Sequence, residues 1–76
     1  MNISLFVGLC ENAGFEVDFR GELIYVHAPN GTLVATVDEA SRALFRVDTY
    51  GVSEDQASKI TEIVIPYALT PIEERE

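Results

Sequence analysis

The first hydrophobic pattern along the chain has the period of an α-helix. Apolar residues recur every three or four positions from Ile3 to Ala13, and this spacing places them on one face of a helix. Asn2 suits the position before a first helical turn, and Gly14 suits the position after a last one. We therefore expect a helix that begins after Asn2 and ends at Gly14.

The period then changes from about 3.6 residues to two. Phe15, Val17 and Phe19 alternate with charged residues, which is the pattern of a half-buried β-strand. The dipeptide Asn30-Gly31 is a strong signal for a β-hairpin between two strands. Three further runs rich in β-forming residues lie at 23–28, 32–38 and 43–48. Together these patterns predict four antiparallel strands connected as a meander.

The register of the predicted strands follows from their loops. Two-residue loops at Gly21-Glu22 and Asn30-Gly31 place apolar residues opposite one another on both sides of the second strand. A slip by one residue would reverse the faces, so the agreement across two independent turns supports this register. The predicted pairs are Phe19 with Ile24, Val17 with Val26, Phe15 with Ala28, Ala28 with Leu33, Val26 with Ala35 and Ile24 with Val37, and Ala43, Phe45 and Val47 continue the same apolar face.

A capping box marks the start of a second helix. Ser53 is followed three residues later by Gln56, and in this arrangement each residue caps a backbone N–H near the other. Pro66 lies in the apolar pattern that follows and has no N–H to donate. We therefore expect the second helix either to kink at Pro66 or to end near Ile65.

Both predicted helices should cover the same face of the sheet. Helices about 10 Å wide fit side by side on four strands that are spaced about 4.8 Å apart. The sequence thus predicts an α+β fold, a four-stranded antiparallel meander with two helices packed on one face, in the order α-β-β-β-β-α. The opposite face of the sheet is expected to stay open.

The last residues look like the start of a third helix. Thr70 suits the N-cap, Pro71 suits the first helical position, and Glu73 completes a second capping box. Six residues cannot hold an isolated helix in water. We expect residues 70–76 to be an incomplete third helix or a frayed tail that is disordered, held by another chain, or simply a solvated acidic terminus.

Composition and charge narrow the classes of function. The chain has 76 residues, which suit a single α+β domain over 1–76. Its net charge of −8 repels nucleic acids and anionic membranes, so we expect neither as a direct partner. An acidic surface suits solubility or a basic protein partner. No run reaches the length of a membrane span, and we expect a cytoplasmic protein.

Residues that could carry chemistry are scarce. Cys10 is the single cysteine and lies among apolar residues, which predicts a buried thiol. His27 is the single histidine, and the register places Glu16 opposite it as a cross-strand charge pair. Asp38 and Asp48 lack the alternating ligand order of a calcium loop. We expect no catalytic residue, no metal site and no cofactor, and therefore a protein that is not an enzyme.

The open face of the predicted sheet is the best candidate for a functional surface. Its register mixes apolar side chains with charged ones, and a contiguous apolar patch with a polar rim is typical of an interface. Tyr25 would lie at the centre of this patch, on an inner strand. The predicted partner-binding residues are Leu23, Tyr25, Val34, Leu44 and Arg46.

The segments NAGFEVDF, PNGTLVATVDE, DTYGVS and above all YALTPIEERE carry a family resemblance. The chain resembles a group of small uncharacterised proteins encoded by phages and prophages of low-GC Gram-positive bacteria. The resemblance implies a host-manipulating or accessory role and transfers no functional residues. We expect a non-enzymatic phage or prophage accessory protein that binds a host or phage protein, with acidic mimicry of nucleic acid as one means. The alternative is a structural module that self-associates, as a homodimer through the open face or the C-terminal helix.

Overall fold

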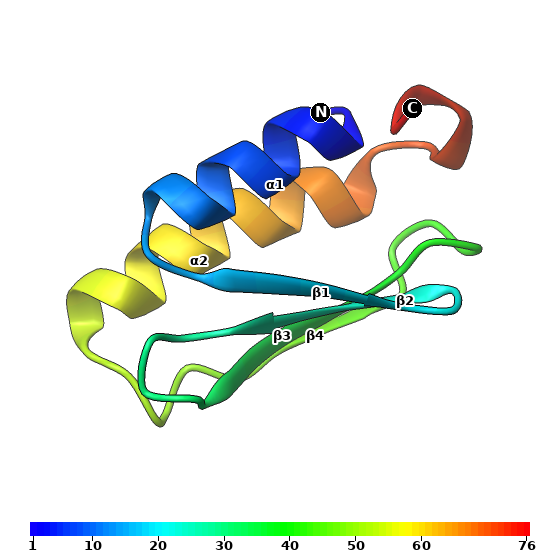
Figure 1. Ribbon diagram of the computed structural model, residues 1–76. Coiled ribbons are helices and arrows are strands. Elements are labelled where there is room, and N and C mark those ends of the chain that lie inside the picture. The colour runs from blue at the N-terminus through cyan, green and yellow to red at the C-terminus, as the bar shows by residue number, and fades with distance from the viewer.

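The computed structural model describes all 76 residues and confirms the α+β fold (Figure 1). Four antiparallel strands lie in the order β1-β2-β3-β4, so consecutive strands are neighbours throughout. Two helices lie side by side on one face of this sheet (Figure 1). The elements are α1 (Ile3–Asn12), β1 (Glu16–Arg20), β2 (Leu23–His27), β3 (Leu33–Asp38), β4 (Phe45–Val47), α2 (Glu54–Leu69) and a 3₁₀ turn, η1 (Ile72–Glu74).

Both helices begin at the predicted caps. The Asn2 Oδ1 accepts a hydrogen bond of 2.9 Å from the Leu5 N–H at the start of α1. At the start of α2, the Ser53 hydroxyl accepts from the Gln56 N–H at 3.2 Å, and the Gln56 Oε1 accepts from the Ser53 N–H at 3.4 Å. The predicted capping box is thus confirmed, and it satisfies backbone N–H groups that have no partner inside the helix.

Pro66 lies inside α2, which continues to Leu69. The expectation that the helix ends near Ile65 is therefore wrong. Proline in a helix interior costs about 3 kcal/mol. Tyr67 and Ala68 are completely buried after the proline, and the packing of these two side chains offsets that cost.

The central register is as predicted. Val17 lies opposite Val26 across β1 and β2, and Val26 lies opposite Ala35 across β2 and β3. Ile24 is completely buried, as is its partner Val37. One apolar face therefore crosses three strands and contacts the helices.

The second hairpin differs from prediction at its turn. Its loop has three residues, Pro29 to Gly31, because the Gly31 N–H donates to the Ala28 carbonyl at 2.9 Å and the Ala28 N–H donates to the Thr32 carbonyl at 2.8 Å. The predicted pair of Ala28 with Leu33 is wrong as a result. A longer loop shifts the register by one position close to the turn.

A β-bulge at Val34 cancels this shift. His27 pairs with Leu33 and Val26 pairs with Ala35, so Val34 is an extra residue without a partner on β2. Val34 and Ala35 both point into the core, where Val34 is 0% exposed. The predicted place of Val34 on the open face is therefore wrong. Leu33 is 41% exposed instead.

The fourth strand is shorter than the predicted range 43–48. Ala43 lies outside β4 with a φ of 66°, and its N–H donates to the Ala68 carbonyl at 2.8 Å. Within β4, Phe45 lies opposite Val37 and Val47 opposite Ala35, as the apolar pattern predicts. Phe45 remains 38% exposed, because β4 is an edge strand.

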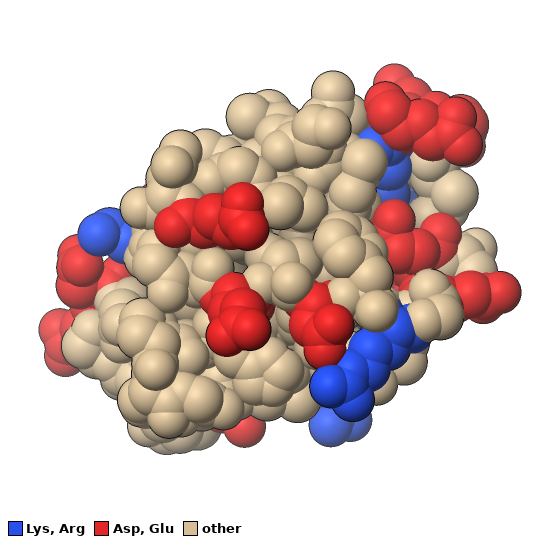
Figure 2. All heavy atoms as spheres, viewed as in Figure 1, with Lys and Arg blue, Asp and Glu red and all other residues tan.

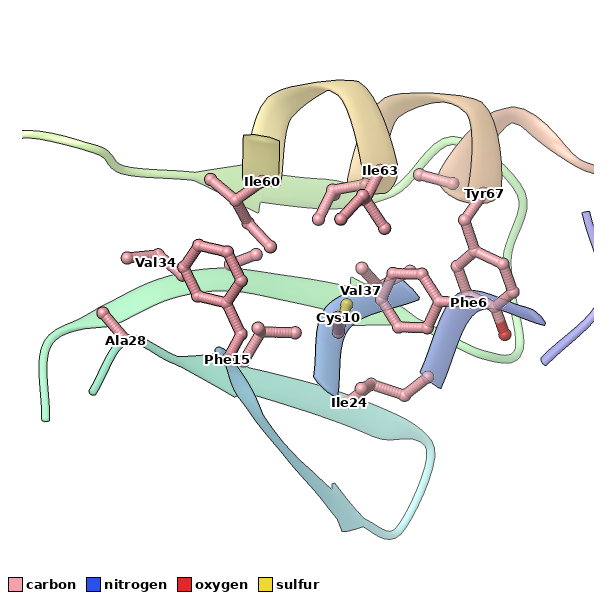
Figure 3. Close-up of a cluster of buried hydrophobic side chains, with 14 residues drawn as sticks. Phe6, Cys10, Phe15, Ile24, Ala28, Val34, Val37, Ile60, Ile63 and Tyr67 are labelled. Atoms are coloured by element: carbon pink, nitrogen blue, oxygen red, sulfur yellow. The ribbon is translucent and has the colours of Figure 1, made fainter. Parts of the chain in front are cut away.

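The core lies between the sheet and the two helices (Figure 3). The rings of Phe6 from α1 and Tyr67 from α2 stack with centroids 4.1 Å apart and planes 15° apart. The Tyr67 hydroxyl donates a 2.7 Å hydrogen bond to the Glu39 carboxylate. A core aromatic with a satisfied hydroxyl thus connects both helices to the β3–β4 loop.

The C-terminal residues form only the single 3₁₀ turn η1 and are held within the chain. Arg75 is 2% exposed and makes four hydrogen bonds. Its guanidinium donates to the carbonyls of Ala68 at 2.9 Å, Asp38 at 2.7 Å and Thr70 at 3.1 Å, and to the Glu39 carboxylate at 3.1 Å. The incomplete third helix is therefore the single 3₁₀ turn η1, and the expectation of a tail that is frayed, disordered or held by another chain is wrong.

The same tail also holds the N-terminus. The Ile3 N–H donates to the Arg75 carbonyl, and the Met1 amino group donates to the Thr70 hydroxyl at 3.2 Å. The Arg75 guanidinium lies over the Tyr67 ring, 4.8 Å from its centroid. We call Arg75, Glu39 and Tyr67 the arginine clamp.

We expect Gly31→Val to lower the free energy of unfolding by about 1–2 kcal/mol, because Gly31 has a φ of 90° that a residue with a Cβ resists. No atom lies within 4 Å of a Cβ built at Gly31, so this loss reports backbone strain alone. The measurement is urea denaturation followed by circular dichroism. Gly8→Ala in α1, where a Cβ also meets nothing, should instead stabilise the protein by up to about 1 kcal/mol. Equal stabilities of the two variants would contradict the turn assignment.

We expect Arg75→Ala to lower the free energy of unfolding by about 3 kcal/mol, since it removes the guanidinium hydrogen bonds to three carbonyls and to the Glu39 carboxylate. The control is Arg42→Ala. Arg42 is exposed and makes one hydrogen bond, to the Leu69 carbonyl at 2.6 Å, so its loss should cost less than about 1 kcal/mol. Thermal denaturation of both variants compares them, and similar losses would contradict a structural role for the clamp.

Candidate functional site

The face of the sheet opposite the helices is covered by no other element (Figure 1). We call it the open face. It contains a shallow hollow of about 440 Å³. The residues that line the hollow are Leu23, Tyr25, Leu33, Thr36, Asp38, Leu44, Phe45 and Arg46.

Four of the five predicted partner-binding residues line this hollow. They are Leu23, Tyr25, Leu44 and Arg46. The fifth, Val34, belongs to the core, and Leu33 takes its place on the open face because of the bulge. The composition of the predicted patch is thereby preserved, with one leucine in place of one valine.

The apolar side chains of the hollow are substantially exposed. Leu44 is 58% exposed and Leu33 is 41% exposed, while Tyr25 is half-buried on the inner strand β2. Apolar surface of this kind favours contact with another apolar surface, since burial stabilises by about 25 cal/mol per Å². A patch gathered around a hollow is more informative than isolated exposed leucines.

Charged groups of both signs surround Tyr25. The Arg20 Nε donates to the Asp18 carboxylate at 2.7 Å, and the Arg20 guanidinium lies 5.8 Å from the centroid of the Tyr25 ring. Asp18 is the direct neighbour of Tyr25 on β1, and Thr36 is its direct neighbour on β3. Tyr25 therefore lies in the middle of the face with polar neighbours on either side.

Arg46 differs from most other basic residues of this acidic chain. Arg20, Lys59 and Arg75 each form an ion pair with an acidic side chain. Arg46 forms none within the chain, and it lies at the β4 side of the hollow. It is thus an unpaired cation next to exposed apolar side chains, which suits recognition of an anionic group on a partner.

Acidic side chains are spread over the molecule and do not form one patch. Figure 2 shows them over the C-terminal turn, at one place on the first helix, near the start of α2 and at the edge of the sheet, with basic side chains at only a few places. Two of the five basic residues, Arg20 and Arg46, lie on strand positions of the open face. Glu16, Asp18 and Asp38 lie on the same face, so charges of both signs meet there.

The acidic residues near the strand ends have structural partners. The Asp38 Oδ1 accepts hydrogen bonds from the N–H groups of Ala40 at 2.7 Å and Ser41 at 3.0 Å. The Asp48 Oδ1 accepts from the Tyr50 N–H at 3.2 Å. These carboxylates shape turns, and Glu39 belongs to the arginine clamp. No group of three His, Cys, Asp or Glu side chains is placed to hold a metal ion.

Burial raises the pKa of two groups that could act as a nucleophile or an acid, Cys10 and Tyr67. Burial, and secondarily the charge of Glu11, raises the pKa of the Cys10 thiol to about 12, so the thiolate does not form near neutral pH. Burial first, and then the hydrogen bond to Glu39, also raises the pKa of Tyr67. His27 lies opposite Glu16 as predicted, and no hydrogen bond joins the two side chains.

Comparison with known proteins gives no assignment: no protein-family model, curated protein or solved structure matches the chain. Neither helix combines the length and the apolar character that crossing a membrane requires.

Two important residues were missed by the sequence analysis. The sequence does not place Leu33 on the open face because Asn30-Gly31 predicts a two-residue loop, although Pro29 before it permits a longer turn. The sequence does not reveal the role of Arg75, because its four acceptors come from two segments, Asp38 and Glu39 after β3 and Ala68 and Thr70 at the end of α2. Nothing in the local pattern around Arg75 signals a buried guanidinium.

We expect Tyr25→Ala to leave folding intact, with a loss of about 1 kcal/mol or less in the free energy of unfolding, because Tyr25 lies outside the core. The control is Tyr67→Ala, which removes a completely buried ring and should cost about 3–5 kcal/mol. Urea denaturation measures both. A large loss on Tyr25→Ala would show that the open face is part of the folded core.

Proposed function

We propose that this chain is a non-enzymatic protein-binding module and that the open face is its binding surface. The observation that carries the proposal is the hollow around Tyr25, where exposed leucines lie beside the unpaired Arg46. Interfaces concentrate aromatic and arginine residues at their centres and polar residues at their rims. The open face has this arrangement.

The chemistry of the site supports a protein as the partner. A net charge of −8 disfavours direct contact with nucleic acids or anionic membranes. The hollow is shallow and lies on a sheet, which suits a complementary protein surface better than a small molecule enclosed on most sides. The buried Cys10 and the absence of a metal-binding cluster favour binding over catalysis.

An accessory role in a phage or prophage, in the cytoplasm of a bacterial host, is part of this proposal. It is supported by the resemblance of the terminal segment YALTPIEERE. In the structure this segment contains Tyr67 and Arg75 of the arginine clamp. The segment that carries the resemblance therefore has a structural role in the clamp, and we place the binding residues elsewhere in the chain.

Apolar contact is a better-supported means of binding than acidic mimicry. A mimic of nucleic acid needs carboxylates arranged on its binding surface. On the open face, Arg20 neutralises Asp18 at 2.7 Å, the Asp38 carboxylate accepts hydrogen bonds within a turn, and Arg46 adds a positive charge. We therefore propose that leucine and tyrosine side chains supply the affinity and that charges orient the partner.

We expect Tyr25→Ala to weaken binding of the partner by about 2 kcal/mol, or roughly thirtyfold, because aromatic residues at an interface centre carry much of the binding energy. The experiment is a pull-down, in which the tagged chain captures proteins from a lysate of a low-GC Gram-positive bacterium. The untagged chain is added as a candidate partner. Affinity for each identified protein is then measured with the purified pair.

Tyr50→Ala is the matched control, because Tyr50 is a fully exposed tyrosine outside the strands. Its loss should leave affinity unchanged. Leu44→Asp combined with Tyr25→Ala should weaken binding further, since it places an unpaired charge in the buried patch. A partner that binds wild type, Tyr25→Ala and Tyr50→Ala with equal affinity would show that the open face is not the binding surface.

A further inference from the structure

One row of side chains crosses the whole open face. Asp18 on β1 lies beside Tyr25 on β2, which lies beside Thr36 on β3, which lies beside Arg46 on β4. The row thus has an acid at one end, a base at the other, and an aromatic and a hydroxyl between them. Three strand spacings of about 4.8 Å separate Asp18 from Arg46, so the two ends cannot pair within one chain.

This order is complementary to itself when it is reversed. Consider two open faces packed against each other, related by a two-fold axis that lies between them and runs parallel to the strands. This symmetry reverses the order of the row in the second copy. Asp18 of each copy then faces Arg46 of the second copy, and Tyr25 faces Thr36. The symmetry produces each contact twice, as in an isologous dimer.

The other face-to-face arrangement is disfavoured by charge. A two-fold axis that lies in the interface, perpendicular to the strands and through this row, places each residue of the row opposite the same residue of the second copy. Asp18 would then face Asp18, and Arg46 would face Arg46. Like charges in direct opposition at an interface are repulsive, so the row distinguishes the two orientations.

We infer that the partner at the open face is a second copy of this chain, packed sheet on sheet with the two-fold axis parallel to the strands. This inference rests on the proposed function and names the partner of the same surface. Aligned packing of two sheets keeps their strands within about 30° of each other, which this axis satisfies. The Asp18 carboxylate uses one oxygen, Oδ2, for Arg20 and keeps the other for Arg46 of the second copy.

The dimer should be weak. Four strands spaced about 4.8 Å apart, with about five residues each at about 3.4 Å per residue, give a face of roughly 300 Å² in plane. Standard specific interfaces bury about 1,200–2,000 Å² in total. The neighbouring row adds no second charge pair, because Leu23 would face Asp38 in the second copy. Association is therefore expected only at high protein concentration.

The test is a charge exchange between two variants. Asp18→Arg leaves arginine at both ends of the row, and Arg46→Asp leaves aspartate at both ends. Each variant alone should dimerise at least about tenfold more weakly than wild type, because both contacts become repulsive. An equimolar mixture should form a heterodimer, since the arginines of one variant then face the aspartates of the other.

Sedimentation velocity at protein concentrations up to about 1 mM measures these constants, a range that reaches weak complexes. Circular dichroism checks that each variant is folded, and Asp18→Lys with Arg46→Glu provides a second pair if one is not. Lys59→Asp is the control for net charge, because Lys59 lies on α2 and pairs with Asp55. This control should dimerise as wild type does.

A wild type that is monomeric throughout, or a mixture that forms no heterodimer, would overturn the inference. A different set of results would contradict the proposed function. If the chain is monomeric but Tyr25→Ala still weakens binding of another protein, the open face binds a different partner and only the inference is wrong. If Tyr25→Ala changes neither self-association nor any other binding, both are wrong.

Discussion

The structure depends on one constraint: the meander has a single apolar face, and two helices are needed to cover it. Ile24, Val26 and Val37 present this face and are completely buried. Because α1 and α2 lie side by side on the same side of the sheet, nothing in the chain is left to cover the other side. The open face, and any function that it has, is a direct consequence of this arrangement of the core.

The arginine clamp completes the fold at the C-terminal end of α2. A buried guanidinium is favourable only when its donors are satisfied, because desolvation of an unpaired charge is costly. Arg75 meets this condition with three carbonyls and the Glu39 carboxylate. Its position over Tyr67 also connects it to the stacked pair of Phe6 and Tyr67. The clamp therefore joins the tail, the β3–β4 loop and both helices in one network.

The charges of the open face have a different role from those of the clamp. Arg75 is buried and satisfied, whereas Arg46 has no acidic partner in its own chain. An exposed ion pair contributes little to stability, so an unpaired surface arginine costs the fold little. In a contact between two copies the same residue selects the relative orientation, since only one two-fold axis brings it to Asp18. In a chain with a net charge of −8, the row that forms this contact carries one acid and one base.

The sequence by itself determined the helices, the strand order, the central register and four of the five open-face residues. Each depends on local signals: the Ser53 and Gln56 cap, the alternation in β1, and turns marked by glycine. Tertiary structure decided the remainder. Val34 points into the core because the three-residue loop shifts the register by one position and the bulge at Val34 restores it. No local sequence pattern indicates that one irregularity will compensate for the other. Arg75 is buried because its acceptors, at the end of α2 and after β3, lie around it. These two segments come together only in the folded chain.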